Sequence, residues 1–138
     1  MMGFQADGAA PLVYNKPCPN PETVATAIRI GNPVSAHLAR AAVSESGGEF
    51  NAVTDEQILE AQRVLAAEGG VFAEPASCAP LAGLMKLKAE GRLPEGITVT
   101  MILTGNGLKD PDTAMSQVGR PIEINDTLDD LMRVLECR

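Results

Sequence analysis

ITVTMILTGNGLKDPDTA, residues 97–114, is the stretch that decides the fold class. Its first part, Ile97 to Leu103, carries no charge and mixes β-branched residues with Leu and Met. Such a composition is typical of a strand covered on both faces, as in a parallel sheet. Two glycines around Asn106 then turn the run into a polar loop. Because open α/β sheets bind ligands at the carboxyl ends of their strands, this loop is the first candidate for a binding site.

Helix-forming patterns precede this stretch at regular intervals. Asn20-Pro21-Glu22 combines an N-cap residue, a proline at the first helical position and an acid in the first turn, which predicts a helix through Ile30. Asn32-Pro33 repeats the pattern and predicts a second helix to about Glu45. Thr54-Asp55-Glu56-Gln57 has the form of a capping box and predicts a third helix, which Gly69-Gly70 ends.

Two further helices are predicted later in the chain. One begins near Ser77, tolerates Pro80 in its first turn and ends at Gly91. The other runs from Leu128 to Glu136. Its apolar residues recur at helical spacing, so we expect one face to point inward: Leu128, Leu131, Met132 and Leu135.

Apolar runs that suit strands are few. Besides residues 97–103 they are Met1 to Phe4, Val71 to Ala73 and Pro121 to Ile124. Short strands that alternate with helices predict an α/β fold with a parallel sheet flanked by helices. Because a parallel sheet needs neighbouring strands and covered faces, we expect this sheet to be incomplete, with further strands supplied by sequence outside this chain.

Length and charge narrow the possible functions. A chain of 138 residues fits one domain. Its net charge of −7 argues against nucleic acid and against anionic membranes as partners. No apolar stretch approaches the roughly 20 residues of a transmembrane helix. We therefore expect a soluble, cytoplasmic protein.

The cysteines and the single histidine do not predict a metal site. Cys18, Cys78 and Cys137 are far apart in the sequence, and His37 has no histidine partner. Zinc sites usually draw on closely spaced pairs of Cys or His. The three thiols are interpreted as reduced structural or surface groups.

Five motifs, taken in order, resemble the C-terminal part of the threonine synthase family. They are GFQADGAAP at 3–11, PET at 21–23 with AIRIG at 27–31, TDEQIL at 54–59, EPAS at 74–77 and LTGNGLKDPDTA at 103–114. This family makes threonine and phosphate from O-phosphohomoserine and water with pyridoxal phosphate. The resemblance implies that residues 1–138 are a single C-terminal segment of a tryptophan synthase β-like catalytic domain. The implied fold is the C-terminal part of the large domain of fold-type II pyridoxal-phosphate enzymes.

The resemblance assigns the central role to Thr104, whose hydroxyl is implied to hydrogen-bond the pyridine nitrogen of the cofactor. A neutral hydroxyl cannot keep that nitrogen protonated as an aspartate would, and the weaker electron sink suits elimination and replacement. Without the family, Thr104 would be interpreted as a strand-end residue that caps backbone groups. Gly105 and Asn106 stand beside it. A glycine there lets the backbone approach a flat ring, or merely forms a turn.

Glu74 and Ser77 are the other cofactor-binding candidates. The resemblance places a glutamate like Glu74 close to the cofactor ring, where a carboxylate can influence protonation. A structural interpretation explains the same residues, with Ser77 as the N-cap of a helix and Glu74 as an acid in its first turn. The sequence leaves both interpretations open.

The resemblance also implies a missing part. Nothing matches the family's Schiff-base lysine motif, Ser-Phe-Lys-Asp-Arg-Gly, or its phosphate loop, and Lys109 belongs to the C-terminal motif instead. We therefore expect no catalytic residue in this chain and no synthase activity from it alone. The implied partners are the missing N-terminal half, a small amino-acid substrate and, in the complete enzyme, a second subunit of a homodimer.

Two other functions stay open at this point. The first is a sister pyridoxal-phosphate enzyme, a threonine or serine dehydratase, because substrate choice rests largely on sequence outside this chain. The second is a non-catalytic binding or partner module. Unpaired strand edges favour this last alternative, since exposed edges recruit partners.

Overall fold

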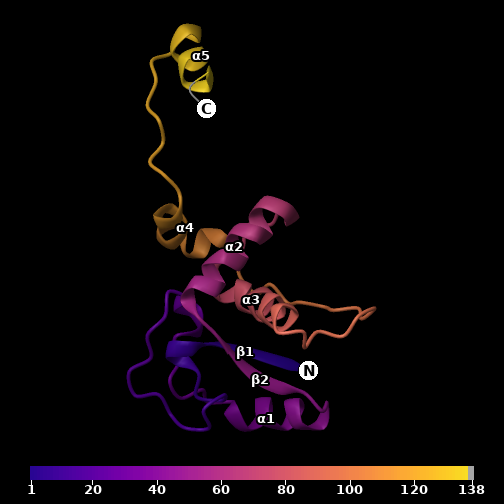
Figure 1. Ribbon diagram of the computed structural model, residues 1–138. Coiled ribbons are helices and arrows are strands. Elements are labelled where there is room, and N and C mark those ends of the chain that lie inside the picture. Colours follow the sequence, from indigo (N-terminus) through magenta and orange to yellow (C-terminus); the bar gives the residue numbers. More distant parts are fainter. Residues whose placement is uncertain (137–138) are drawn as a thin grey trace.

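The computed structural model describes residues 1–136 and has an α/β architecture (Figure 1). Strands β1 (Met2–Ala6) and β2 (Glu49–Val53) pair in parallel, with Met2 opposite Glu49 and Ala6 opposite Val53. The connection between them contains helix α1 (Ala36–Glu45). A parallel pair requires a long crossover of this kind, and a helix commonly supplies it. The predicted α/β class is therefore confirmed, with a small parallel sheet flanked by helices.

Helices α2 (Asp55–Gly69) and α3 (Pro75–Ala89) pack against each other, and α3 also contacts both strands. Figure 1 shows the strand pair between this helical layer and α1. Small residues allow the close packing: a Cβ atom added to Gly83 of α3 would lie 2.0 Å from the ring of Phe4. The fully or almost fully buried core is dominated by alanine and aliphatic side chains: Ala6, Val53, Ile58, Ala61, Ala79 and Ala82.

The start and end of α2 agree with the sequence pattern. The Thr54 hydroxyl accepts a hydrogen bond from the backbone N–H of Gln57, whose side chain accepts one from the N–H of Thr54. This is the predicted capping box. At the other end Gly70 is left-handed, with φ of +65°, and its N–H donates to the carbonyl of Leu65. A glycine adopts this conformation without the strain that a side chain would introduce.

The helix predicted over residues 20–30 is wrong. This segment is a loop that contains only the short 3₁₀ turn η2 (Thr26–Ile28). Asp55 explains the difference, because its carboxylate accepts hydrogen bonds from the Thr23 hydroxyl at 2.5 Å and from the Val24 N–H at 3.0 Å. These long-range bonds satisfy backbone and side chain without a helix. Helix α1 also begins later than predicted, at Ala36, although it ends at Glu45 as expected.

The strand predictions were only partly correct. Met1 to Phe4 overlaps β1, but β2 was missed because Glu49 and Asn51 interrupt its apolar character. Residues 97–103 and 121–124 are extended without strand pairing, and Val71 to Ala73 contributes a single bridge residue. The strand prediction for 97–103 was wrong because this segment has no strand with which to pair. No described strand lies beside it, and Ile102 is 73% exposed.

The chain ends in α4 (Pro111–Gln117), an extended segment and α5 (Leu128–Glu136), which lies apart from the other elements (Figure 1). The predicted helix is confirmed, but its apolar face is exposed rather than buried. Two short 3₁₀ turns, η1 (Asp7–Ala9) and η3 (Gly107–Lys109), complete the elements of the described residues. The interpretation of Cys137 falls on a residue outside the described range.

Candidate functional site

The candidate site forms where the segment before α3 meets the loop that follows residues 97–103. Ala73 and Asn106 form an isolated antiparallel bridge. On either side of it, the Glu74 N–H donates to the carbonyl of Gly105 and the Gly107 N–H donates to the carbonyl of Phe72, both at 3.0 Å. The bridge therefore holds the Thr104 loop against the first turn of α3, and it brings all five predicted site residues into one region.

Ser77 connects the helix to the loop through its side chain. It is 1% exposed, and its hydroxyl oxygen accepts a hydrogen bond from the Gly105 N–H at 2.7 Å. The same oxygen lies 3.0 Å from the hydroxyl oxygen of Thr104. The N-cap position of α3 belongs to Glu74, so the interpretation of Ser77 as N-cap is wrong. Its hydroxyl instead accepts the hydrogen bond from Gly105 that connects the helix to the loop.

Thr104 is exposed, unlike Ser77, with which it shares a hydrogen bond. A hydroxyl has one donor and two acceptor sites. The Ser77 oxygen accepts from Gly105, and either hydroxyl of the Ser77–Thr104 pair can be the donor between them. When Ser77 donates, the Thr104 hydrogen is left to donate outward to a ligand that carries an acceptor atom.

Gly105 lies in close contact with the side chain of Glu74. A Cβ atom added to Gly105 would lie 1.9 Å from a carboxylate oxygen of Glu74. Glu74 is only 6% exposed, and its side chain makes no cap hydrogen bond to α3. It precedes the first turn rather than lying in it, so the first-turn interpretation is wrong too. The Glu74 carboxylate is therefore buried beside the loop, and it does not cap the helix through a side-chain hydrogen bond.

Asn106 has a local partner. Its side-chain oxygen accepts a hydrogen bond from the Leu108 N–H at 2.9 Å, which fixes the turn η3. Gly107 follows in a tight position, because a Cβ atom there would lie 2.5 Å from the ring of Phe72. Asn106 and Gly107 therefore shape the loop, whereas Thr104 and Ser77 present hydroxyl groups.

Cys78 is next to Ser77 in α3 and is fully buried. Burial, and secondarily the charge of Glu74, raise the pKa of its thiol to about 11. Thiols react as thiolates, so a raised pKa makes this cysteine a neutral packing group at neutral pH. Among the described residues there is also no cluster of three or more His, Cys, Asp or Glu side chains suited to a metal ion.

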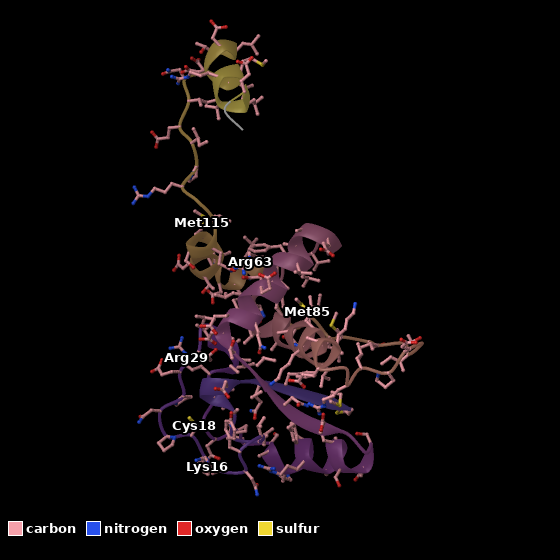
Figure 2. All side chains as sticks on the ribbon, in the orientation of Figure 1. Lys16, Cys18, Arg29, Arg63, Met85 and Met115 are labelled. Atoms are coloured by element: carbon pink, nitrogen blue, oxygen red, sulfur yellow. The ribbon has the colours of Figure 1, made fainter. Side chains whose placement is uncertain are left out.

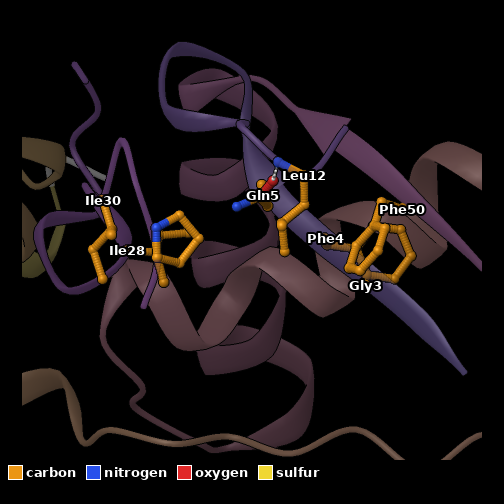
Figure 3. A pocket seen from close by; sticks show the side chains of 8 residues that line it. Gly3, Phe4, Gln5, Leu12, Ile28, Ile30 and Phe50 are labelled. Carbon is orange, nitrogen blue, oxygen red and sulfur yellow. Dashed lines mark hydrogen bonds between the residues drawn. The ribbon is translucent and has the colours of Figure 1, made fainter. Parts of the chain in front are cut away.

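Hollows also lie outside this site, among them two that differ in their lining. One, of about 230 Å³, is bordered by Gly3, Phe4, Gln5 and Phe50, and its lining side chains include no acid, base or nucleophile (Figure 3). The side-chain oxygen of Gln5 is already occupied by the N–H of Leu12 at 2.8 Å. The other is an apolar groove of about 600 Å³ that lies between β1, α3 and the unpaired segment 97–102. Phe4, Leu84 and Val99 each contribute to it.

Sequence reasoning missed the residues that support the site from behind. Gln62 of α2 is 4% exposed, and its side chain bonds the carbonyl of Ala73 and the side chain of Gln117. The available signal was its spacing, four residues after Ile58 in the buried stripe of α2, where a polar side chain needs a partner. Lys86 of α3 also has a partly buried partner, because its Nζ donates to the carbonyl of Ala52 in β2 at 2.8 Å.

The fold and this pair of hydroxyl groups define an α/β protein whose candidate binding loop packs against the start of a helix. A profile of the family described as "Pyridoxal-phosphate dependent enzyme" matches residues 1–105. The chain belongs to this family, and pyridoxal phosphate is the cofactor of its complete members. In the part of the chain that the structure describes, no helix is long and apolar enough to cross a membrane.

Curated relatives agree with this assignment. The chain is 58% identical to a threonine synthase of Synechocystis sp. over 123 residues, which is 89% of this chain and 32% of the relative. It is 49% identical to a threonine synthase of Methanocaldococcus jannaschii over 144 residues, or 99% of this chain and 36% of the relative. The chain thus spans about a third of the length of these relatives.

Two solved structures have the same fold. A threonine deaminase from T.th. aligns with a TM-score of 0.60 at 25% identity, covering 76% of this chain and 39% of that one. An O-ureido-L-serine synthase, solved as a mutant with O-ureido-L-serine bound, aligns with a TM-score of 0.66 at 19% identity, covering 99% and 38%. Both are much longer than this chain, in agreement with a sheet that is incomplete here.

The donor set at the site fits the family cofactor. A pyridine nitrogen is an acceptor in its neutral form, and the exposed Thr104 hydroxyl, 3.0 Å from the buried Ser77 hydroxyl, can donate to such a nitrogen. The glycine at 105 removes the side chain that would collide with Glu74 and keeps the backbone close to that carboxylate. Thr104, with Ser77 and Gly105 behind it, would hold the ring end of the cofactor.

Proposed function

We propose that this chain forms one wall of the cofactor pocket of a threonine synthase. The observation that carries the proposal is the arrangement of Ser77, Thr104 and Gly105, in which a buried hydroxyl orients an exposed one. The proposed reaction converts O-phosphohomoserine and water to threonine and phosphate. Relatives named threonine synthase at 49–58% identity support this choice over other family members.

The proposed chemistry assigns each residue a limited task. Bound pyridoxal phosphate would supply the electron sink for loss of phosphate and addition of water. Thr104 would donate a hydrogen bond to the pyridine nitrogen and keep its proton, so that this nitrogen stays unprotonated. Ser77 would orient Thr104. Glu74, buried against Gly105, would place a carboxylate near the ring, where it can influence protonation.

The remainder of the enzyme would complete the pocket. The lysine that the family bonds to its cofactor has no matching motif in these 138 residues, so we propose that the chain alone has no synthase activity. The apolar groove between β1, α3 and segment 97–102 is the proposed seat of the N-terminal half. About two thirds of each relative lies outside the match with this chain, which is enough sequence to form that N-terminal half. The complete enzyme is proposed to be a cytoplasmic homodimer.

A deaminase is the second candidate. The alignment with the threonine deaminase from T.th., at a TM-score of 0.60, favours it. A deaminase would use the same hydroxyl at the ring nitrogen, because the two chemistries differ at the substrate rather than at the ring. The reaction product therefore separates these two candidates, and the site geometry does not.

The experiment is a chimera in which this chain replaces the aligned stretch of the Synechocystis relative. We expect the chimera to release equal amounts of phosphate and threonine from O-phosphohomoserine. A second chimera, in which this chain replaces the aligned stretch of the threonine deaminase from T.th., tests the other candidate. Release of ammonia from threonine by this second chimera, without phosphate release from O-phosphohomoserine by the first, would transfer the assignment to the deaminase. A folded chimera that binds pyridoxal phosphate and catalyses neither reaction would overturn the enzymatic proposal and leave a non-catalytic module.

A further inference from the structure

We propose that Gln62 is a positioning residue that holds the Thr104 loop in place from within the α2–α3 layer. Gln62 makes no hydrogen bond to Thr104, Ser77 or Gly105. It is nevertheless one of the few polar side chains buried in the core, at 4% exposure. A buried amide requires partners for both its ends, and the partners of Gln62 lie on the two segments that flank the loop.

The first partner is the segment before α3. The side-chain nitrogen of Gln62 donates to the carbonyl of Ala73 at 2.7 Å. Ala73 is the residue that bridges Asn106, and its neighbours Phe72 and Glu74 hold Gly107 and Gly105. The Gln62 bond therefore fixes the middle of the segment on which the loop rests.

The second partner is the helix that follows the loop. The side-chain oxygen of Gln62 accepts a hydrogen bond from the side-chain nitrogen of Gln117, the last residue of α4, at 2.5 Å. Gln117 in turn accepts from Arg63 at 3.2 Å. Arg63 of α2 and Met115 of α4 are labelled in Figure 2, which shows the region where these two helices approach.

A neutral amide is the group that these partners require. The Ala73 carbonyl can only accept, and the Gln117 nitrogen can only donate, so residue 62 must present one donor and one acceptor. A carboxylate at 62 would place an oxygen against the carbonyl oxygen of Ala73. An aliphatic side chain would leave the buried carbonyl without its partner, which is the costly outcome for a polar group. A protonated carboxyl group would restore both bonds.

This inference rests on the proposed function only in its last step, the effect on the cofactor. With Gln62 in place, the bridge at Ala73 and the end of α4 fix both flanks of residues 104–110. The hydroxyl of Thr104 is then held where Ser77 can orient it. Without Gln62, the loop keeps the Ser77 bond, the bridge and the 3.4 Å hydrogen bond from Thr26 to Asp110, but the segment on which it rests is no longer held from α2.

Hydrogen exchange followed by NMR on the 138-residue chain tests the positioning role. In Gln62→Leu we expect the amides of Glu74, Gly105 and Gly107 to exchange about tenfold faster, since a lost buried hydrogen bond of roughly 1.4 kcal/mol corresponds to that factor. The amides of β2 should stay within about twofold of the native chain. Ile58→Val is the matched control, because Ile58 lies on the same helix, is fully buried and touches neither partner by a hydrogen bond. Its effect should spread evenly over loop and strand.

Gln62→Glu supplies a readout that general destabilisation would not move. After correction for the intrinsic pH dependence of exchange, the loop amides should be protected at pH below the carboxyl pKa and lose protection above it. Equal loop exchange in Gln62→Leu and the native chain would overturn the proposal. So would a rise shared equally with β2, or a Gln62→Glu chain whose loop protection does not depend on pH.

The chimera separates this inference from the proposed function. If the unsubstituted chimera catalyses neither reaction, the proposed function fails while the exchange result still decides the role of Gln62. In an active chimera, Gln62→Leu should weaken the binding of pyridoxal phosphate by about tenfold, measured by fluorescence titration. Unchanged cofactor affinity together with unchanged loop exchange would show that Gln62 is an ordinary core residue.

Discussion

The hydroxyl oxygens of Ser77 and Thr104 lie 3.0 Å apart, although 27 positions separate the two residues in the sequence. Ser77 is buried and already accepts a hydrogen bond from the Gly105 N–H, whereas Thr104 is exposed. The buried member of the pair is fixed by the Gly105 N–H and holds the exposed Thr104 hydroxyl in place. When Ser77 is the donor between them, the Thr104 hydroxyl can donate to a ligand.

Ser77→Ala should lower the free energy of unfolding by about 1–3 kcal/mol, because the buried Gly105 N–H loses its partner. Urea unfolding followed by circular dichroism measures the change. Ser116→Ala is the control: its hydroxyl donates to the Thr113 carbonyl at an exposed position, so the loss there should be below about 0.5 kcal/mol. Equal effects of the two substitutions would contradict the role given to Ser77.

Gly105→Ala should destabilise the loop, because the new Cβ atom would lie 1.9 Å from the Glu74 carboxylate. We expect a loss of about 1–3 kcal/mol in urea unfolding. Gly119→Ala is the control, since a Cβ atom at Gly119 would meet nothing within 4 Å.

A second substitution tests the cause of that loss. Glu74→Ala removes the atoms that the new methyl group would meet, so Gly105→Ala should cost much less in the Glu74→Ala background. The two changes should be non-additive, as expected for residues in contact. Additive free energies would place the strain of Gly105→Ala elsewhere.

The raised pKa of the Cys78 thiol leads us to expect a loss of stability at high pH. Its thiol has a pKa of about 11 in the folded chain, above its ordinary value, because of burial and the charge of Glu74. Between about pH 9 and pH 11 the unfolded chain releases this proton and the folded chain keeps it, so the free energy of unfolding falls as pH rises. Below about pH 9 the contribution is fully present. The loss attributable to Cys78 is at most about 3 kcal/mol.

The measurement for Cys78 compares the native chain with Cys78→Ala in urea at about pH 8 and about pH 10.5, on either side of the ordinary thiol pKa. Other groups ionise in the same range, so the informative quantity is the difference between the two chains. The stability of the native chain should decrease more than that of Cys78→Ala. Parallel decreases would mean that the thiol titrates alike in the folded and unfolded chains.

Local interactions account for what could be predicted from the sequence. The capping box at Thr54 and the left-handed Gly70 involve residues within one or two turns of each other, and both helix ends were predicted correctly. The segment around Thr23 looked equally helical, but Asp55, more than thirty residues away, holds it in a loop. A sequence pattern carries no information about such a distant partner.

The candidate site, too, could be predicted from the sequence only in part. Thr104, Gly105 and Glu74 were named because their motifs resemble a family, not because spacing placed them together. Their contacts arise from the bridge between Ala73 and Asn106, which joins two segments more than thirty residues apart. Gln62 belongs to no motif, and only the structure shows that its buried amide bonds both flanks of the loop.

The most direct test of the account is the cofactor affinity and kcat/KM of the chimera with Thr104→Val and with Thr104→Ser. If the Thr104 hydroxyl bonds the pyridine nitrogen, the valine variant should lose at least about tenfold in both quantities. The serine variant, which keeps the hydroxyl, should stay within about threefold. A valine variant that binds pyridoxal phosphate and turns over substrate as well as the unsubstituted chimera would contradict the central claim.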